Sequence, residues 1–342
     1  MRKKMVSVVL ALTVAVCMMS GCGSKEEPAA PAPEETEAPE AEGAEEEAGT
    51  EQKGAEGELP GAGKTIAFVP KQLGNPYFVA VRDAVEEAAV ANGFEFKCNA
   101  PDSSIEVDKQ ISICEAFIAE GVDVLIVIPN DATAIVDVIN SASEKGIAVL
   151  LVDSGADESN YISYIGTDNY AGGGVAAEWF KENVSGKVAV IDGAAGNAAT
   201  TARYKGFADG LEGFDGIEIV TSDYGNGDMG TSMTVAENFL TSYPDLAAIF
   251  CCDDQMAQGA GQAVAPTGRD VIVCGFDGSP EGAQAILDGV MDVSIAQTPR
   301  IMGTTAVEYA VKYLNGEEIE RVIYTDCQVV SAENASDYLE WH

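Results

Sequence analysis

From residue 65 onward, short apolar runs alternate with longer stretches whose apolar residues lie three and four positions apart. The run at 122–128 is almost entirely Val, Ile and Leu, and a proline follows it. Short runs of this kind are typical of strands, and the longer spaced stretches are typical of helices. Several of these stretches end at a glycine, the usual C-terminal stop of a helix, as at Gly93, Gly121 and Gly146.

The pattern predicts two consecutive sets of strands and helices. The first set alternates strand and helix over 65–69, 78–92, 94–98, 107–120, 122–128, 132–145 and 148–152. After Asp168 the alternation begins again with a helix, over 172–183, 187–191, 199–211, 217–221, 231–241, 247–251, 255–263, 271–273, 280–287 and 292–296. Uninterrupted apolar strands indicate a parallel sheet with helices on both faces. We therefore predict an α/β protein of two doubly wound parallel-sheet lobes.

The N-terminal residues have a different pattern. A basic start at 2–4, an apolar run at 5–19 and small residues before Cys22 predict a secretion signal. A cysteine directly after small residues resembles the lipobox of bacterial lipoproteins, although Met19 stands where Leu is commoner. This resemblance implies a signal peptide over 1–21 and a lipid on Cys22. A plain signal with an incidental cysteine and an uncleaved anchor are the alternatives, but the apolar run is shorter than the roughly 20 residues that span a bilayer.

The segment after Cys22 is acidic and poor in apolar residues. From 23 to 63 it holds thirteen Glu and two Lys, no aromatic residue, and Leu59 as its only large aliphatic residue. Such a segment buries too little apolar surface to offset the entropy of ordering it. We therefore predict a lipidated cysteine followed by a disordered acidic linker over 22–63.

Charge and composition exclude several classes of protein. The formal net charge of −37 argues against nucleic-acid binding, which needs clustered Lys and Arg. The one histidine is the last residue, so the usual catalytic base and metal ligand is missing from the body. The chain has no G-x-S-x-G, H-E-x-x-H or G-x-x-x-x-G-K motif. We expect a binding protein with no metal and no cofactor, and not an enzyme.

Beyond the signal and Cys22 the chain holds six cysteines. Even numbers of cysteine outside the cell are compatible with disulfides. The alternative, which we favour, is that most act as small apolar residues, because they lie in or beside apolar runs. They are Cys98, Cys114, Cys251, Cys252, Cys274 and Cys327.

Polar and aromatic residues follow the predicted strands, where open parallel sheets bind ligands. Carboxylates and amides pair with hydroxyls, a guanidinium donates in a fork, and an aromatic face covers the C–H side of a sugar ring, so this set suits a neutral polyol. Other roles remain open, namely a turn at the asparagine, core packing of the aromatics, helix capping by the aspartates, a surface ion pair of the arginine and a purely structural glutamine. The candidates are Asn75, Tyr77, Phe78, Asp153, Ser154, Arg203, Asp253, Asp277 and Gln297.

Over residues 65–330 the chain resembles the sugar-binding proteins of the ribose/galactose class of bacterial ABC importers. Seven motifs in family order carry the resemblance, namely G-N-P-Y-F, V-L-L-V-D, G-T-D-N-Y-A-G-G, A-R-Y-K-G-F, D-D-Q-M-A-Q-G-A, C-G-F-D-G-S-P and I-A-Q-T-P. The resemblance implies a type I periplasmic-binding-protein (Venus-flytrap) fold with a three-crossing hinge. By analogy, 64–167 and 298–326 form the N-terminal lobe, and 168–297 and 327–342 form the C-terminal lobe.

The resemblance also implies that eight of the nine candidate residues named above, all except Ser154, contact the sugar. Three positions depart from the ribose-binding pattern: Ser154 replaces an Arg, Asp253 replaces an Asn, and the aromatic residue that the pattern has near Gly227 is missing. We expect a roomier, more acidic pocket and a ligand other than ribose, such as a hexose, another pentose, a cyclitol or a small furanose signal.

The family implies a protein that closes its lobes on a small-molecule sugar or polyol and delivers it to the membrane subunits of an ABC permease. The expected protein is a monomer outside the cytoplasm, lipid-anchored to the outer face of the cytoplasmic membrane or in the periplasm. A ligand-sensing subunit for a chemoreceptor or signalling receptor is the alternative. A LacI-type repressor shares the two-lobe core but needs a basic DNA-binding headpiece, and an acidic segment occupies that place here.

Overall fold

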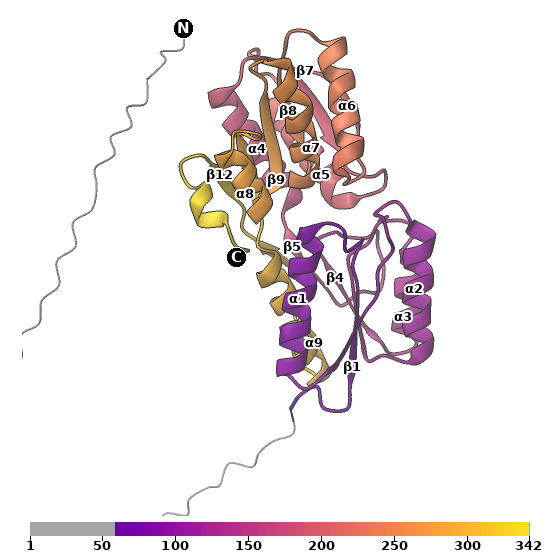
Figure 1. Ribbon diagram of the computed structural model, residues 1–342. Coiled ribbons are helices and arrows are strands. Elements are labelled where there is room, and N and C mark those ends of the chain that lie inside the picture. Colours follow the sequence, from indigo (N-terminus) through magenta and orange to yellow (C-terminus); the bar gives the residue numbers. More distant parts are fainter. Residues whose placement is uncertain (1–58, 342) are drawn as a thin grey trace, which may run out of the picture. The chain divides into compact units, whose positions relative to one another are not determined.

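Two six-stranded sheets form the body of the protein in the computed structural model, which describes residues 59–341 (Figure 1). The strand order is β11-β5-β4-β3-β1-β2 in the first sheet and β12-β10-β9-β8-β6-β7 in the second. All pairings are parallel except that of β12 with β10. We call the first sheet with its helices lobe 1 and the second lobe 2. The prediction of two parallel-sheet α/β lobes is confirmed.

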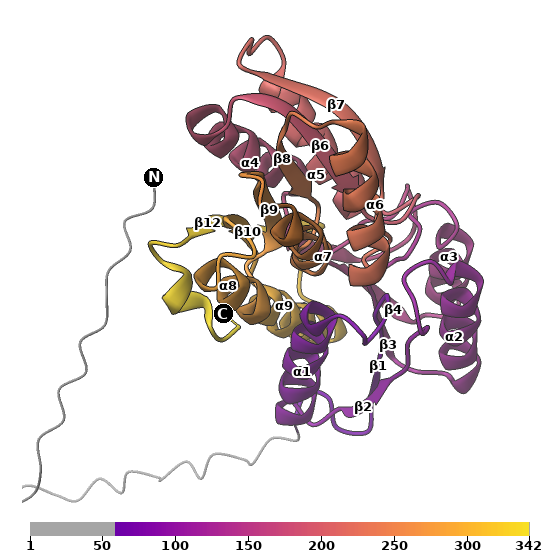
Figure 2. The ribbon, with the colours of Figure 1, turned by 45° about the horizontal axis from the view of Figure 1, so that its top comes forward.

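Lobe 1 joins the beginning of the described chain to a segment close to its end. In Figures 1 and 2 the late helix α9 lies beside the early helix α1. The elements are β1 (Thr65–Val69), α1 (Pro76–Ala91), β2 (Glu95–Cys98), α2 (Val107–Glu120), β3 (Val124–Val127), α3 (Val136–Glu144), β4 (Ala148–Val152), β5 (Ser163–Thr167), α9 (Pro299–Leu314) and β11 (Val322–Thr325).

Lobe 2 holds the middle of the chain and its last described residues. Its elements are α4 (Asn169–Asn183), β6 (Gly186–Asp192), α5 (Ala198–Leu211), β7 (Ile217–Tyr224), α6 (Met229–Ser242), β8 (Leu246–Cys251), α7 (Asp254–Val264), β9 (Ile272–Asp277), α8 (Pro280–Leu287), β10 (Val293–Ala296) and β12 (Gln328–Ser331), with short 3-10 helices at Ala265–Thr267 and Ala335–Tyr338.

Side chains of one strand alternate between the two faces of its sheet, which places apolar cores on both faces. In β1, Ile66 and Phe68 belong to the core under α1 and α9, whereas Ala67 and Val69 belong to the core under α2 and α3. All four are fully buried. This two-sided burial is why the predicted strands are continuous apolar runs.

The chain passes between the two sheets three times, after β5, after β10 and between β11 and β12. The segments at these passages therefore lie beside one another, although they are far apart in the sequence. Within lobe 2, α4 and α5 pack closely at Gly173, where a Cβ would lie 2.1 Å from the Arg203 carbonyl oxygen. The glycine run at the start of α4 thus serves helix packing.

Most predicted elements form within a few residues of the expected bounds. The helix expected at 132–145 begins only at Val136, because the Asp131 carboxylate accepts hydrogen bonds from the backbone N–H groups of Thr133 and Ala134 and holds a turn there. The sequence pattern missed β5, α9, β11 and β12. The last two are short and largely exposed, so their apolar pattern is weak, and α9 buries mainly small side chains against α1.

The acidic linker ends earlier than the predicted residue 63. Residues 59–63 form a turn, in which the Gly61 N–H donates to the Asn92 carbonyl oxygen at 2.8 Å. Gly61 is buried against Phe94, which explains why this stretch is ordered. The predicted signal peptide over 1–21, the lipidation site Cys22 and the rest of the linker lie outside the described residues.

Two further expectations concern cysteines and membrane spans. All six body cysteines are free, and four of them, Cys114, Cys251, Cys252 and Cys274, are buried. These four belong to the apolar cores of the lobes, as predicted for most of the cysteines. Between residues 59 and 341 no helix is both long and apolar enough to cross a bilayer.

Candidate functional site

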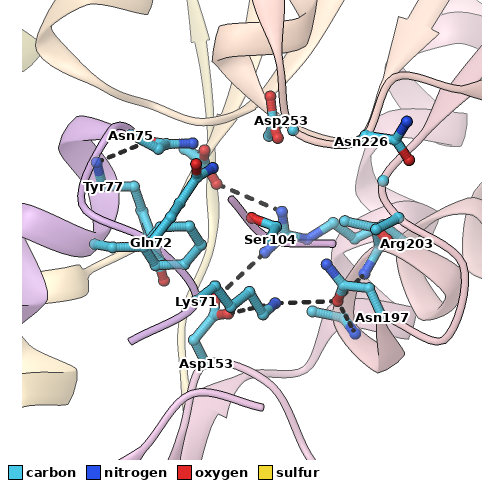
Figure 3. Close-up of a pocket in the computed structure, with 17 residues that line it drawn as sticks. Lys71, Gln72, Asn75, Tyr77, Ser104, Asp153, Asn197, Arg203, Asn226 and Asp253 are labelled. Atoms are coloured by element: carbon cyan, nitrogen blue, oxygen red, sulfur yellow. Dashed lines mark hydrogen bonds and ion pairs between the residues drawn. The ribbon is translucent and has the colours of Figure 1, made fainter. Parts of the chain in front are cut away.

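The carboxyl ends of the strands of both lobes face one cavity (Figure 3). Its volume is about 30 Å³, and about 430 Å³ when the space that opens to solvent is included, so the two lobes lie close together across it. The predicted site residues that line it are Asn75, Tyr77, Phe78, Asp153, Arg203, Asp253 and Asp277. The other two predicted residues, Ser154 and Gln297, do not line the cavity. Each forms a hydrogen bond with a residue that does.

Three of the lining residues cap helices that begin directly after strands. The Asn75 side chain accepts from the Tyr77 N–H at the start of α1, and the Asp253 carboxylate accepts from the Met256 N–H at the start of α7. Asn197 caps α5 in the same way. Capping, which the sequence left open for Asp153 and Asp277, is instead performed by Asn75, Asn197 and Asp253, and it coexists with their place in the cavity wall. Strand-to-helix turns bring such residues to the same edge of a sheet.

The backbone is strained at the cavity. Within residues 59–341, the non-glycine residues with clearly positive φ are Asp153 at 62°, Asn226 at 57° and Asp277 at 130°. Each of them lines the cavity. Such conformations cost on the order of 1–3 kcal/mol and persist where the surroundings enforce them, often at functional sites. These backbone conformations set the positions of the Asp153 and Asp277 carboxylates at the ends of their strands.

Arg203 is the central cation of lobe 2. Its Nε donates to Asn169 Oδ1 at 2.7 Å, and its Nη1 donates to the Cys252 carbonyl oxygen at 2.8 Å and to Asp277 Oδ1 at 3.4 Å. The guanidinium lies 4.0 Å from the centroid of the Phe276 ring. These contacts leave Nη2 facing the cavity, 3.8 Å from the Asp153 carboxylate of lobe 1. A surface ion pair, the alternative role left open for this residue, is excluded, because Arg203 is only 3% exposed.

Lys71 is a second buried cation that the sequence analysis did not identify. It follows β1, and its Nζ contacts Ser154 Oγ at 2.5 Å, Asn197 Oδ1 at 3.1 Å and Asp153 Oδ2 at 3.4 Å. The expectation that the replacement of an Arg by Ser154 removes a cation and leaves a roomier pocket is therefore wrong. The ammonium of Lys71 occupies the space beside the Ser154 hydroxyl.

The carboxylates of lobe 2 are held in a dry environment. Burial raises the pKa of Asp253 to about 6 and that of Asp254, which lies behind it, to about 7. Burial also raises the pKa of Asp277 well above its usual range, against the opposing effect of Arg203. The expectation of an acidic pocket therefore holds for lobe 2, where Asp253 and Asp277 face one arginine. Carboxylates that lack water accept hydrogen bonds strongly from ligand hydroxyls.

Gln297 connects the chain passages to the cavity. Its Nε2 donates to Asp277 Oδ1 at 2.7 Å, and its Oε1 accepts from Thr167 Oγ1 at 2.7 Å. Thr167 ends β5 at the first passage, and Gln297 stands at the second. The glutamine thus orients the carboxylate through a hydrogen bond and also joins two passages.

The aromatic residues stand on the lobe 1 side. Phe78 lines the cavity, and Tyr77 packs edge-on against it with ring centroids 5.4 Å apart. The Tyr77 hydroxyl contacts Met302 Sδ at 3.4 Å, and its ring also contacts Trp341. On the lobe 2 side Gly227 also lines the cavity.

Several polar lining residues were missed by the sequence analysis. Each follows a strand or begins a helix at the same sheet edge, so the rule that selected Asn75 would have found them if it had been applied to every strand end. Short polar residues in turns carry no other signal. They are Lys71, Gln72, Ser104, Asn197, Thr200 and Asn226. Residues 59–341 contain no group of His, Cys, Asp and Glu side chains arranged to hold a metal ion.

Comparisons with known proteins agree with this geometry. Residues 66–318 match the family model described as periplasmic binding protein domain. The ribose import binding protein RbsB of Bacillus subtilis (strain 168) is 32% identical over 261 residues, which cover 76% of this chain and 84% of that protein.

Two solved structures are similar over most of the chain. One is an ABC transporter periplasmic solute binding protein from Actinobacillus succinogenes 130z with bound D-allose, with a TM-score of 0.74, 30% identity and coverage of 80% of this chain and 100% of that chain. The other is a Caulobacter myo-inositol binding protein bound to myo-inositol, with a TM-score of 0.74, 30% identity and coverage of 80% and 95%.

Proposed function

The chain belongs to the type I periplasmic sugar-binding proteins of ABC importers, and from this premise we propose that it binds a monosaccharide or similar neutral polyol between its lobes and delivers it to the permease. One observation carries the proposal: a single cavity is walled by strand ends of both lobes and holds carboxylates, cations and an aromatic face. A ligand that bonds both walls favours the closed arrangement by its differential affinity.

Each wall has a role in this proposal. The carboxylates of Asp153, Asp253 and Asp277 accept hydrogen bonds from ligand hydroxyls, and Arg203 Nη2 donates to a ligand oxygen. Phe78 covers the C–H face of the sugar ring. No step changes the ligand covalently, so the protein acts as a carrier and not as an enzyme.

We expect a ligand other than ribose. Asp253 stands where the ribose-binding pattern has an amide, and Gly227 stands where it has an aromatic ring, so the lobe 2 wall is more acidic and offers no second ring face. A hexose, another pentose, a small furanose or a cyclitol fits these groups. The bound D-allose and myo-inositol of the two similar structures belong to these classes.

The site of action is outside the cytoplasm, where binding proteins of ABC importers work. The finer proposal is that the protein is a monomer anchored to the membrane by a lipid on Cys22, with the acidic linker as a tether. The basic start, the apolar run and the small residues before Cys22 support it. Replacing Cys22 with Ser should release the protein from the membrane fraction; membrane retention would contradict the lipid anchor.

A thermal-shift screen of the purified full-length protein against monosaccharides, cyclitols and amino acids tests the ligand class. A sugar at 100 times its dissociation constant should stabilise the fold by about 2.7 kcal/mol. Isothermal titration calorimetry should then give one site per chain. A shift with amino acids and none with any carbohydrate would overturn the proposed function.

A further inference from the structure

A second pocket adjoins the sugar cavity, and we call it the side pocket. It shares the Asn75 and Asp277 side chains with the cavity, so the two spaces meet at these residues. Lobe 1 contributes residues 74–76 at the start of α1, and lobe 2 contributes the beginnings of α6, α7 and α8. Apart from the two shared residues, none of its lining residues belongs to the predicted sugar site.

The side pocket has more room than the cavity that it adjoins. Its volume is about 170 Å³, and about 490 Å³ with the space that opens to solvent. The corresponding volumes of the cavity are about 30 Å³ and about 430 Å³. A ligand held between the lobes in this arrangement can therefore carry a further group into the side pocket.

Several polar side chains of the side pocket have no partner among residues 59–341. Gln255 Oε1 is buried and accepts no hydrogen bond there. Gln258 and Glu281 form neither a side-chain hydrogen bond nor an ion pair with the described part of the chain. Buried polar groups are almost always paired, so an exception such as Gln255 Oε1 requires an explanation. A ligand group in the side pocket would give these side chains their partners.

Asp254 fixes the lobe 2 wall of the side pocket. Its Oδ2 accepts hydrogen bonds from the Ser279 N–H at 2.7 Å and from the Ser279 hydroxyl at 2.8 Å, and its Oδ1 accepts from Ser294 Oγ at 2.5 Å. These bonds join the start of α7 to the start of α8 and to β10. Gln255 and Gln258 follow on one face of α7, because they are three positions apart. The wall is therefore formed before a ligand arrives, which lowers the entropic cost of binding.

The groups of the side pocket fit a neutral substituent that carries hydroxyls. The amides of Gln255 and Gln258 donate and accept, and the Glu281 carboxylate accepts, so each can pair with a hydroxyl. None of the described residues that line the side pocket is Lys or Arg, so a phosphate or a carboxylate of the ligand would find no counter-charge in its wall. Pro76 and Met229 offer apolar surface for the C–H groups of a second ring.

Resting on the proposed function, we propose that the preferred ligand is a neutral glycoside of about disaccharide size. One unit, the monosaccharide or polyol of the proposed function, lies in the cavity between the lobes. A second glycosyl unit lies in the side pocket, where Gln255, Gln258 and Glu281 bind its hydroxyls. Lobe 1 completes this second subsite with residues 74–76, so both units favour the arrangement in which the lobes are together.

Isothermal titration of the full-length protein with matched pairs of ligands tests the proposal. The pairs are D-galactose with melibiose, D-glucose with maltose, D-xylose with xylobiose, and myo-inositol with galactinol. We define the glycosyl advantage as the dissociation constant of the single unit divided by that of its glycosylated form. In at least one pair it should be about ten or more, the value of one or two hydrogen bonds.

Two variants and a matched control locate the second unit. Gln258→Trp fills the side pocket and should abolish the glycosyl advantage. Glu281→Ala removes an exposed acceptor and should reduce the advantage by a few-fold, and it keeps the test open should Gln258→Trp fail to fold. Both variants should leave the affinity for the single unit unchanged. Gln284→Trp adds the same bulk at an exposed position of α8, where the amide pairs with Asp288, and should change neither quantity.

The outcomes separate this inference from the proposed function. If the unmodified protein binds none of these ligands, the proposed function is wrong, and the second subsite falls with it. If it binds a single unit and no glycosylated form binds more tightly, the site takes one unit and the inference alone is overturned. A glycosyl advantage that stays unchanged in both folded variants also overturns the inference, because the second unit then lies outside the side pocket.

Discussion

The two walls of the cavity are both formed at the carboxyl ends of strands, but their charged and aromatic side chains differ. In lobe 1, Lys71 faces Asp153, so the charges balance, and Phe78 adds an aromatic face. In lobe 2, Asp253 and Asp277 face the single cation Arg203. From this difference we infer that lobe 1 packs against the sugar ring. Lobe 2 has more carboxylates than cations and accepts hydrogen bonds from the sugar hydroxyls. The difference also places the sensitivity to pH mainly in lobe 2.

Removal of the lobe 2 cation should have the largest effect. Arg203→Met leaves the buried Asp277 and Asp153 without their shared partner, so we expect the free energy of unfolding to fall by about 3–5 kcal/mol and sugar binding to become undetectable. Urea unfolding and calorimetry measure the two effects. Arg300→Met is the control, because its ion pair with Glu87 is exposed and contributes at most about 1 kcal/mol. Full binding by Arg203→Met would contradict the central place of this residue.

A change of pH should act on affinity and stability in opposite directions. Sugar hydroxyls donate to ionised carboxylates, so affinity should rise by about tenfold between pH 5 and pH 8 as Asp253, with its pKa of about 6, and its neighbours ionise. Because the folded-state pKa values are raised, the folded protein binds more protons than the unfolded chain between about pH 4 and pH 7. These groups therefore stabilise the folded protein at low pH, and their contribution to the free energy of unfolding is lost as the pH rises from about 4 to about 7.

Calorimetry and urea unfolding from pH 5 to pH 8 measure both trends. Asp253→Asn cannot ionise, so both curves should become flatter in this variant. If affinity and stability depend on pH as steeply in Asp253→Asn as in the unmodified protein, another group causes the pH dependence. An affinity that falls with rising pH would contradict the acceptor role of the lobe 2 carboxylates.

Loss of the aromatic face tests the role assigned to lobe 1. Phe78→Leu keeps an apolar side chain but removes the ring, so affinity should fall by about three- to tenfold, in line with the value of an aromatic contact beyond its buried area. Phe78→Tyr restores the ring and should recover most of the affinity in the same calorimetric assay. Equal sugar affinity in Phe78→Leu and the unmodified protein would show that the Phe78 ring does not contact the sugar.

The smallest effect is expected at Asn226, a polar residue of the lobe 2 wall with φ at 57°. Asn226→Gly adopts this backbone conformation without strain, so stability should stay within about 1 kcal/mol of the unmodified value. The lost amide should lower affinity by a few-fold. If calorimetry shows unchanged affinity, Asn226 borders the cavity without contacting the sugar.

Local sequence chemistry was enough to predict the two lobes and seven of the seventeen residues that line the cavity. Continuous apolar strands followed by amphipathic stretches specify buried parallel sheets, and residues such as Asn75, Asp153 and Asp277 stand directly after those strands. Their convergence follows from the sheet itself, because the carboxyl ends of parallel strands share one edge. The weak edge strands β11 and β12 were missed because half-exposed residues carry little periodicity.

The sequence by itself determined the acidic excess of lobe 2 and the aromatic face of lobe 1, since both depend on residue types that follow strands. Only the tertiary structure decided that Lys71 fills the place next to Ser154, that Ser154 and Gln297 lie behind the wall, and that the Tyr77 hydroxyl contacts Met302. The physical reason is that a side-chain direction depends on neighbours from distant strands, and the three-dimensional packing of two lobes brings those neighbours together.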